Sequence, residues 1–372
     1  QIQQFGKGVD WQDLIFRQAP TNDYSLSVSG GNDKSQFSAG ASYFDQKGII
    51  ENSAYRRIGA RISANHDISD KFSVSYNAIL ARVDNNPSSD NLNLLFSALT
   101  APPTVGPYLD DGEYRNLNTV YPFSPDNTIN PIAYINEVSN KQVSNNEMVN
   151  LAMIYKPIKG LSLKISGNIS NTDQRNDSYT STKYPNSSGS ASVSVFNSVH
   201  LNSDNIVSYV KTFGKSNISA TGALTYENYA DKSLSASGSG FTADVTRTDN
   251  LGSANTFSTP STSYSSWTLL SYLGRINYAY DDRYLATVSF RADGSSRYSA
   301  GNKWGYFPSA ALAWKFSKEN FMHGISWIDD GKVRVGYGVT GSTAIDPYYT
   351  LNMLQAGKAP FNNDLYTYFS PG

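Results

Sequence analysis

The sequence predicts an all-β fold: part of an antiparallel up-and-down transmembrane β-barrel, with about twelve strands of a larger barrel. Three observations support this prediction. Apolar residues recur at every second position through most of the chain, which is the period of a β-strand. Short turns and long polar stretches alternate between these runs, and aromatic residues lie near both ends of them.

Composition excludes several other classes of protein. The 372 residues carry a net charge of −1, so no basic stripe is available for nucleic acid. Cysteine is absent and there are 3 histidines, so we expect no disulfide, catalytic residue, metal site or cofactor. No apolar run approaches the ~20 residues of a membrane-spanning helix. Tyrosine accounts for 26 residues, and its half-polar ring is typical of membrane interfaces.

The clearest alternation runs through residues 266–316. Tyr272, Ile276 and Tyr280 share one face there, and a tight turn follows at 281–282 before the next run begins. The other face is small and polar and carries Arg275 and Arg291. A soluble sandwich buries its apolar face, whereas a membrane barrel turns that face to lipid and the polar face to its lumen. Both give this alternation, so the connections must decide between them.

Nine further runs show the same alternation along the chain, which gives twelve expected strands. We expect strands at 24–28, 37–43, 58–64, 72–80, 149–155, 161–169, 205–213, 218–226, 272–280, 284–290, 306–316 and 333–339. Residues 91–99 are expected to form one short helix inside the longest polar stretch.

The connections between these strands alternate in length. Short turns are expected near 31–34, 67–70, 157–160, 214–217 and 281–282, and long links near 45–54, 85–144, 173–198, 231–265 and 293–303. In an up-and-down meander all short turns fall at one end of the sheet and all long loops at the other. This asymmetry is typical of outer-membrane barrels, which have short periplasmic turns and long extracellular loops. It favours the barrel over the sandwich.

Three segments carry a family resemblance. They are residues 10–50, the pair RADGSSRY (291–298) and WGYFPS (304–309), and VRVGYGVTGS (333–342). With these motifs in this order and spacing, the chain resembles the SusC/RagA-type TonB-dependent outer-membrane transporters of Bacteroidetes. The long loops between the motifs match more loosely.

The resemblance implies a barrel of roughly 22 strands around a plug domain. Residues 1–372 would then be part of that single barrel domain, with a leading segment at 1–20, strands across 22–341, and the plug and C-terminal strands outside the sequence. It also implies import of oligosaccharides or peptides across the outer membrane. The implied partners are a SusD-like surface lipoprotein and the TonB–ExbB–ExbD complex, which acts through the plug region.

Two groups of residues are candidates for function. On the polar strand face, Arg275, Arg291, Asp293 and Arg334 would point into the lumen or contact the plug, although Arg291 and Asp293 also fit a plain structural pair. In the longest loop, aromatic side chains would stack on sugars or peptides, pack on the partner lipoprotein, or hold the loop together. These aromatic residues are Tyr108, Tyr114, Tyr121, Phe123 and Tyr134.

Enzymatic chemistry finds no support in the sequence. His66, His200 and His323 stand at turns, strand starts or connections, where a Ser–His hydrolase would not place its base. Residues 214–216 read Gly-Lys-Ser but lack the upstream glycine of a phosphate loop. Two other non-enzymatic classes remain: a β-rich surface adhesin or structural protein, and a passive porin.

Overall fold

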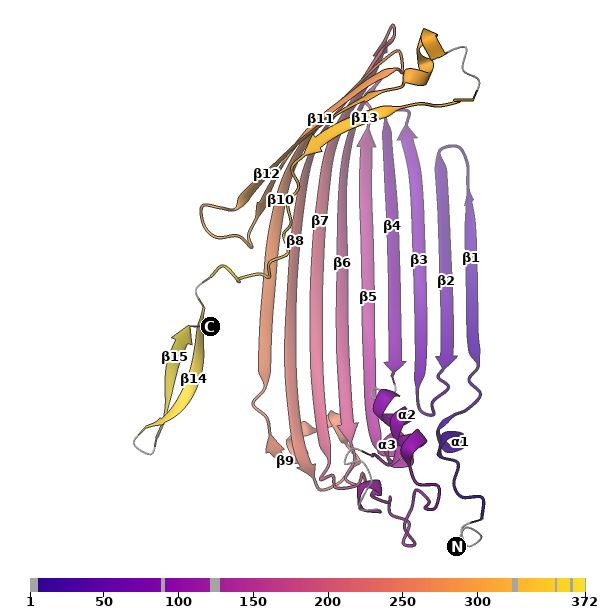
Figure 1. Cartoon of the computed structure of the whole chain (residues 1–372), viewed down its shortest axis with the longest axis vertical. Coiled ribbons are helices and arrows are strands. Elements are labelled where there is room, and N and C mark those ends of the chain that lie inside the picture. The colour runs from indigo at the N-terminus through magenta and orange to yellow at the C-terminus, as the bar shows by residue number, and fades with distance from the viewer. Residues whose placement is uncertain are drawn as a thin grey trace.

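The computed structural model describes residues 6–87, 91–120, 128–322, 327–351, 353–361 and 364–371. Most of these residues lie in one large antiparallel sheet (Figure 1). Its strands are β1 (Thr21–Gly31), β2 (Ser35–Lys47), β3 (Ala54–Ser69), β4 (Phe72–Asn86), β5 (Val138–Tyr155), β6 (Leu161–Thr180), β7 (Ser190–Phe213), β8 (Ser216–Phe241), β9 (Ala254–Phe257), β10 (Ser261–Tyr280), β11 (Tyr284–Ser295), β12 (Trp304–Trp314) and β13 (Val333–Gly338). A separate hairpin contains β14 (Leu354–Phe361) and β15 (Asp364–Pro371).

The sheet is an up-and-down meander. Each strand from β1 to β8, and from β10 to β13, pairs with its neighbours in chain order, and β8 joins β10 while the short β9 also pairs with β8. The predicted fold class is therefore confirmed, and short and long connections alternate from β1 to β12. Within the described residues β1 and β13 do not pair with each other, so the sheet is not closed.

The cross-strand register places most of the apolar side chains of the strands on one face. Ile276 of β10 faces Ala220 of β8 and Val288 of β11, and the row continues through Ala310 to Tyr337. This face is unburied: the relative exposure is 77% for Leu26, 66% for Leu312 and 72% for Val335. Because exposing apolar area to water costs about 25 cal/mol per Å², such a continuous face needs an apolar environment.

The apolar band has a limited height. On β6 the outward residues from Leu161 to Ile169 are apolar or Gly, and Asn171 and Asp173 follow on the same face. At about 3.3 Å per residue, the apolar part of β6 is about 26 Å long. These nine residues match the length of a tilted strand that crosses the hydrocarbon layer, about 9–11 residues. Beyond the band the strand is polar on both faces.

Two expectations about the loops were wrong. The stretches near 173–198 and 231–265 are largely strand: β6 runs to Thr180, β7 begins at Ser190, and β8 reaches Phe241 before β10 begins at Ser261. The connection between β6 and β7 is only 181–189. On β6 beyond Ile169 both faces are polar, so the alternation disappears there while the backbone hydrogen bonds continue unchanged. On β7, Val193 and Val195 still alternate with serines, a strand pattern that the predicted loop at 173–198 did not take into account.

The long-loop end of the sheet carries a small hydrophobic core. It is formed by α1 (Trp11–Ile15), α2 (Asn91–Thr100) and α3 (Pro131–Glu137) together with the 3₁₀ turn η2 (Leu117–Thr119). Figure 1 shows the three helices grouped beneath the lower ends of β1–β5. The buried residues are Trp11, Ile15, Leu94, Ala98, Ala101, Leu117 and Ile135. The helix expected at 91–99 is confirmed. The helices of the described ranges are all too short or too polar to cross a membrane.

Ionic contacts join the short turns at the opposite end. Glu319 accepts hydrogen bonds from the Tyr284 hydroxyl (2.6 Å), the Trp314 indole (3.0 Å) and Arg283 (2.9 Å). Asp282 pairs with Lys315 and Lys318, and their hydrogen bonds lower the pKa of its carboxyl to about 2. The β10–β11 turn is thereby tied to the connection that follows β12.

A carboxylate joins two connections at the long-loop end. Asp244 accepts hydrogen bonds from the Tyr179 hydroxyl, the Thr182 amide (2.9 Å) and the Thr182 hydroxyl (2.8 Å). Partial burial raises the pKa of Asp244, but these hydrogen bonds outweigh it and hold the pKa below its ordinary value. A lowered folded-state pKa means that this contact stabilises the fold above the unfolded-state pKa of about 3.9 and is lost as pH falls further.

We expect Asp244→Asn to loosen this junction. The amide cannot replace every hydrogen bond, so local stability should fall by about 1–3 kcal/mol. The protection factor of the Thr182 amide, its exchange rate relative to the intrinsic rate at the same pH, should fall and no longer depend on acid pH. Hydrogen exchange of the full-length protein at pH 3 and pH 6 measures this. Asp249→Asn, an exposed substitution in the same connection, is the control. Equal exchange in both variants at both pH values would contradict the assignment.

Candidate functional site

The polar face of the sheet carries all four charged residues predicted for the lumen. Arg275 faces Thr221 and Ser289 in the register, and Arg334 faces Ala313, all on the side opposite the apolar band. The structure brings only two of the four together, Arg291 and Asp293, while Arg275 and Arg334 lie closer to the short turns.

Arg291 and Asp293 form an ion pair near the long-loop end of β11. The Arg291 Nε atom donates to both carboxylate oxygens of Asp293, at 2.8 and 2.9 Å, and Nη2 donates to the Ser271 hydroxyl on β10 at 3.0 Å. Ser271 is buried, with 2% exposure. The guanidinium therefore links two neighbouring strands, although a half-exposed pair of this kind contributes only about 0–1 kcal/mol.

Several cations of this face have no anionic neighbour. Within the described residues, Arg61, Lys164, Arg275 and Arg334 form no side-chain hydrogen bond or ion pair, and all lie on the polar face in the register. Asp204, on the same face, accepts from the Thr225 hydroxyl instead (2.8 Å). The polar wall near the short turns therefore carries uncompensated positive charge.

An aromatic row that the sequence did not predict lies on the same face, nearer the long-loop end. His200, Tyr229 and Trp267 are register neighbours on β7, β8 and β10, with ring centroids 6.0–6.1 Å apart. The guanidinium of Arg297 lies over the Trp267 ring at 4.3 Å, a cation–π contact. The three residues are far apart in the sequence and meet only because β7, β8 and β10 pair side by side, so no local motif predicts the row.

The motif RADGSSRY holds a neighbouring segment in place. Arg297 Nη1 donates to the Thr343 carbonyl (2.9 Å) and the Tyr298 hydroxyl donates to the Ser342 carbonyl (2.6 Å). The Tyr348 hydroxyl accepts a hydrogen bond from the Ser266 amide on β10 and lies within hydrogen-bond distance of the Ser266 hydroxyl. Two of the family-like motifs, 291–298 and 333–342, are thus in direct contact.

The loop aromatics lie within or beside the packing of their own loop. The rings of Tyr108 and Tyr114 are 5.2 Å apart, and the Tyr114 hydroxyl donates to Glu137 (2.9 Å). Burial, followed by this hydrogen bond, raises the pKa of Tyr114 to about 12. Tyr134 packs against the loop core. Residues Tyr121 and Phe123 lie outside the described residues.

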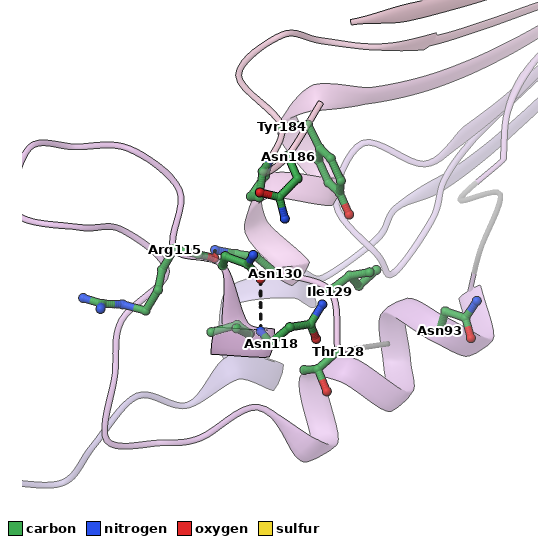
Figure 2. Close-up of a pocket in the computed structure, with 11 residues that line it drawn as sticks. Asn93, Arg115, Asn118, Thr128, Ile129, Asn130, Tyr184 and Asn186 are labelled. Atoms are coloured by element: carbon green, nitrogen blue, oxygen red, sulfur yellow. Dashed lines mark hydrogen bonds between the residues drawn. The ribbon is translucent and has the colours of Figure 1, made fainter. Parts of the chain in front are cut away.

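A polar cavity of about 480 Å³ opens at the long-loop end (Figure 2). It lies between the loop that precedes β5 and the connection between β6 and β7, and most of its residues carry amide or hydroxyl groups. The lining residues are Asn93, Arg115, Asn116, Leu117, Asn118, Thr128, Ile129, Asn130, Tyr184, Pro185 and Asn186. The sequence analysis did not identify this pocket, since its asparagines come from separate loops.

Two asparagines build the frame of the pocket. Asn130 caps α3 by accepting from the amides of Ile132 and Ala133, and its own amide donates to the carbonyls of Pro107 (2.7 Å) and Arg115 (3.0 Å). Asn116 caps η2 in the same way, through the Asn118 amide. These side chains are already satisfied, so they hold the loop rather than offer groups to a ligand.

Other side chains converge on the open space. Figure 2 shows the side chains of Asn118, Asn186 and Tyr184 directed toward the middle of the pocket, while the Arg115 side chain points away. The Arg115 guanidinium donates to the carbonyls of Gly106 and Tyr108, both at 3.1 Å. The described residues contain no cluster of side chains that could hold a metal ion. The pocket thus offers neutral hydrogen-bonding groups.

Known proteins similar to this chain share one class. No family model matches the sequence. The TonB-dependent receptor P26 of Formosa agariphila is 29% identical over 362 residues, which cover 95% of this chain and 36% of the receptor. The TonB-dependent receptor SusC of Bacteroides thetaiotaomicron is 29% identical over 394 residues, covering 97% of this chain and 38% of SusC. The chain thus spans little more than a third of these relatives.

A solved structure shows the same fold. The RagAB peptide transporter superposes with a TM-score of 0.83 at 22% identity, over 99% of this chain and 42% of the matching chain. Together with the meander and its apolar face, these similarities define the chain as part of a TonB-dependent receptor barrel. Within that class it is of the SusC/RagA type, as the motifs predicted.

The Arg291–Asp293 pair gives a prediction on stability. In a double-mutant cycle with alanine at both positions, we expect a coupling free energy of about 0.5–1 kcal/mol that declines with added salt. Urea unfolding of the full-length receptor in detergent measures it. Arg275 and Asp293, which make no contact in the described structure, form the control cycle with coupling near zero. Additive effects in the first cycle would contradict the pair.

Proposed function

We propose that this chain is barrel wall in a TonB-dependent importer that carries oligosaccharides or peptides across the outer membrane of a Gram-negative bacterium. The observation that carries the proposal is the sequence similarity to TonB-dependent receptors over 95% of the chain. The apolar band supports the membrane location, because its length on β6 fits the hydrocarbon layer. Residues 1–372 form part of one barrel domain in this proposal, with no catalytic role.

The orientation of the wall follows from its two ends. The short turns would face the periplasm, and the long loops with their small core would face the outside. A SusD-like lipoprotein would contact the long-loop end, where Tyr108 and the neighbouring aromatic residues lie. The similarity to the RagAB peptide transporter supports a peptide substrate. The oligosaccharide alternative comes from the resemblance to the SusC/RagA family, of which SusC is a relative of this chain.

The polar face would surround the plug. Arg61, Lys164, Arg275 and Arg334 need anionic partners or water, and a plug domain that presents carboxylates would supply those partners. Arg291, paired with Asp293, would instead brace the wall. This assigns the residues predicted for the lumen to two roles: free cations that contact the plug, and a structural pair near the rim.

Energy-dependent import tests the proposal against the alternatives. Cells that lack the gene should lose uptake of the cognate labelled nutrient, and the full-length gene should restore it. Uptake should stop when a protonophore collapses the proton gradient or when TonB is deleted. Uptake that survives both treatments would indicate a passive porin. A full-length protein that stays soluble without detergent, and mediates no uptake, would indicate the surface adhesin.

Charge reversal tests the polar wall. We expect Arg275→Glu to destabilise the full-length receptor by about 1–3 kcal/mol, because a charged hydrogen bond to the plug would become a repulsion, whereas Arg275→Lys keeps most of the stability. Thermal unfolding in detergent measures both variants. Lys34→Glu in the exposed β1–β2 turn is the matched control. Equal unfolding temperatures for all three would remove Arg275 from the plug contact.

A further inference from the structure

We propose that the β5–β6 and β7–β8 turns hold the headgroup of one anionic phospholipid, with an acyl chain of that lipid in an adjacent groove of the apolar face. This site rests on the membrane location proposed above, because it needs a lipid leaflet at the short-turn end of the wall. It adds one lipid class at one place on the barrel. Both turns lie at the end of the sheet opposite the three helices (Figure 1).

Three exposed lysines in and beside these two turns have no anionic partner. Lys156 and Lys159 lie in the β5–β6 turn, and Lys211 lies near the end of β7. Within the described residues, none of the three forms a side-chain hydrogen bond or an ion pair. The sequence holds no Asp or Glu across 148–172 or across 205–226. Both turns are therefore purely cationic.

Lysines of the following turns differ, because carboxylates neutralise them. Lys215 pairs with Asp281 at 3.0 Å, and Lys315 pairs with Asp282 at 2.8 Å. The β3–β4 turn, whose Lys71 carbonyl accepts from the amide of residue 156, also carries Asp70. The uncompensated charge is thus greatest between the start of β6 and the end of β7.

A backbone contact joins the two turns at this place. The Val210 amide donates to the Gly160 carbonyl at 2.8 Å and continues the ladder between β6 and β7. Lys159 precedes this glycine and Lys211 follows this valine, so their backbones lie side by side. Gly160 has a φ of +88°, and a Cβ atom there would come within 2.2 Å of the Val210 carbonyl oxygen. Only glycine permits this approach.

Lys211 belongs to the apolar face. In the register it lies opposite Ile218 of β8, which in turn faces Tyr278 of β10. Apolar side chains beside the lysines are open to the surroundings, with 61% exposure for Ile158 and 50% for Phe213. A lysine at the edge of a lipid-facing surface lays its methylene stem along that surface and holds its ammonium group at the level of the headgroups.

A groove of about 430 Å³ lies on the same face, farther from the turns. Gly222 and Gly274 face each other in the register and form its shallow part, and Tyr209 and Phe290 are among the larger residues around them. Tyr209 stands two residues before Lys211 on the same face, so the groove begins about 7 Å from that lysine along β7.

An anionic phospholipid matches both features in one molecule. Its phosphate lies at the membrane interface and its chains run from there into the hydrocarbon, which is the direction from Lys211 to the groove. A chain seated in the groove gains dispersion contacts that a flat wall does not provide. A zwitterionic headgroup would bring an ammonium group that the lysines repel. A soluble polyanion would contact the lysines and leave the groove empty.

Native mass spectrometry of the full-length receptor, stripped of lipid in detergent, tests the site. Phosphatidylglycerol and phosphatidylethanolamine with the same palmitoyl and oleoyl chains are titrated, beside glycerol phosphate and peptidoglycan fragments as soluble anions. We expect one phosphatidylglycerol to bind about tenfold more tightly than phosphatidylethanolamine, with a preference that declines as salt is added. Lys159→Gln and Lys211→Gln should each weaken its binding about fivefold, which corresponds to about 1 kcal/mol.

Gly274→Leu tests the groove separately from the charge. A Cβ atom at position 274 would meet no other atom within 4 Å, so leucine fills the groove without displacing the wall. This variant should bind both lipids several-fold more weakly, keep the preference for phosphatidylglycerol, and unfold at the wild-type temperature or above. Lys34→Gln is the matched control, because this exposed lysine lies at the same end of the sheet beside Asp33. It should bind as the wild type does.

Four results would overturn the lipid site: equal binding of the two lipids, a preference that both lysine variants leave unchanged, wild-type lipid binding by Gly274→Leu, or soluble anions that bind as tightly as phosphatidylglycerol. Uptake in cells keeps this site distinct from the import function. If energy-dependent uptake is present while the purified receptor shows no lipid preference, the lipid site fails and the importer stands. If uptake is absent while lipid binding depends on the lysines, the importer fails and the lipid site stands.

Discussion

The unbroken backbone ladder from β1 to β13 is the constraint on which the rest of the structure depends. In a hydrocarbon layer no water can satisfy an N–H or C=O group, so every strand must be paired on both sides. Because each strand pairs with the next one along the chain, the register decides which alternate residues share a face of the sheet. It places Ile276, Val288 and Ala310 on one face. Arg275 and Arg291 lie on the other face. The apolar band and the cationic wall are therefore two consequences of one register.

The two ends of the sheet are stabilised by different interactions. Short turns leave little chain to bury, and ionic contacts such as Lys215 with Asp281 join them. The long-loop end has enough chain to form a small core around Leu94 and Leu117, with asparagine caps and the Asp244 junction around it. Rigid loops of this kind can hold a preformed pocket, which flexible polar loops would not.

The candidate sites differ in how far the sequence could predict them. Arg291 and Asp293 stand two residues apart on one strand face, so their common side and their pairing follow from the period of two. The pocket could not be found in this way, because Asn118 and Asn186 come from loops whose relative position depends on the α2–α3 core and on the length of β6. The row of His200, Tyr229 and Trp267 likewise exists only through pairing among β7, β8 and β10.

The sequence by itself determined the all-β meander, the outward and inward faces, the sides of the short turns and the family resemblance. All of these depend on local alternation and turn residues, which act over a few neighbouring positions. Only the tertiary structure decided how far β6, β7 and β8 extend and where the loop core and its pocket lie. On β6 beyond Ile169 both strand faces are polar, so local hydropathy there cannot separate strand from loop, and only the hydrogen-bonded neighbouring strands decide.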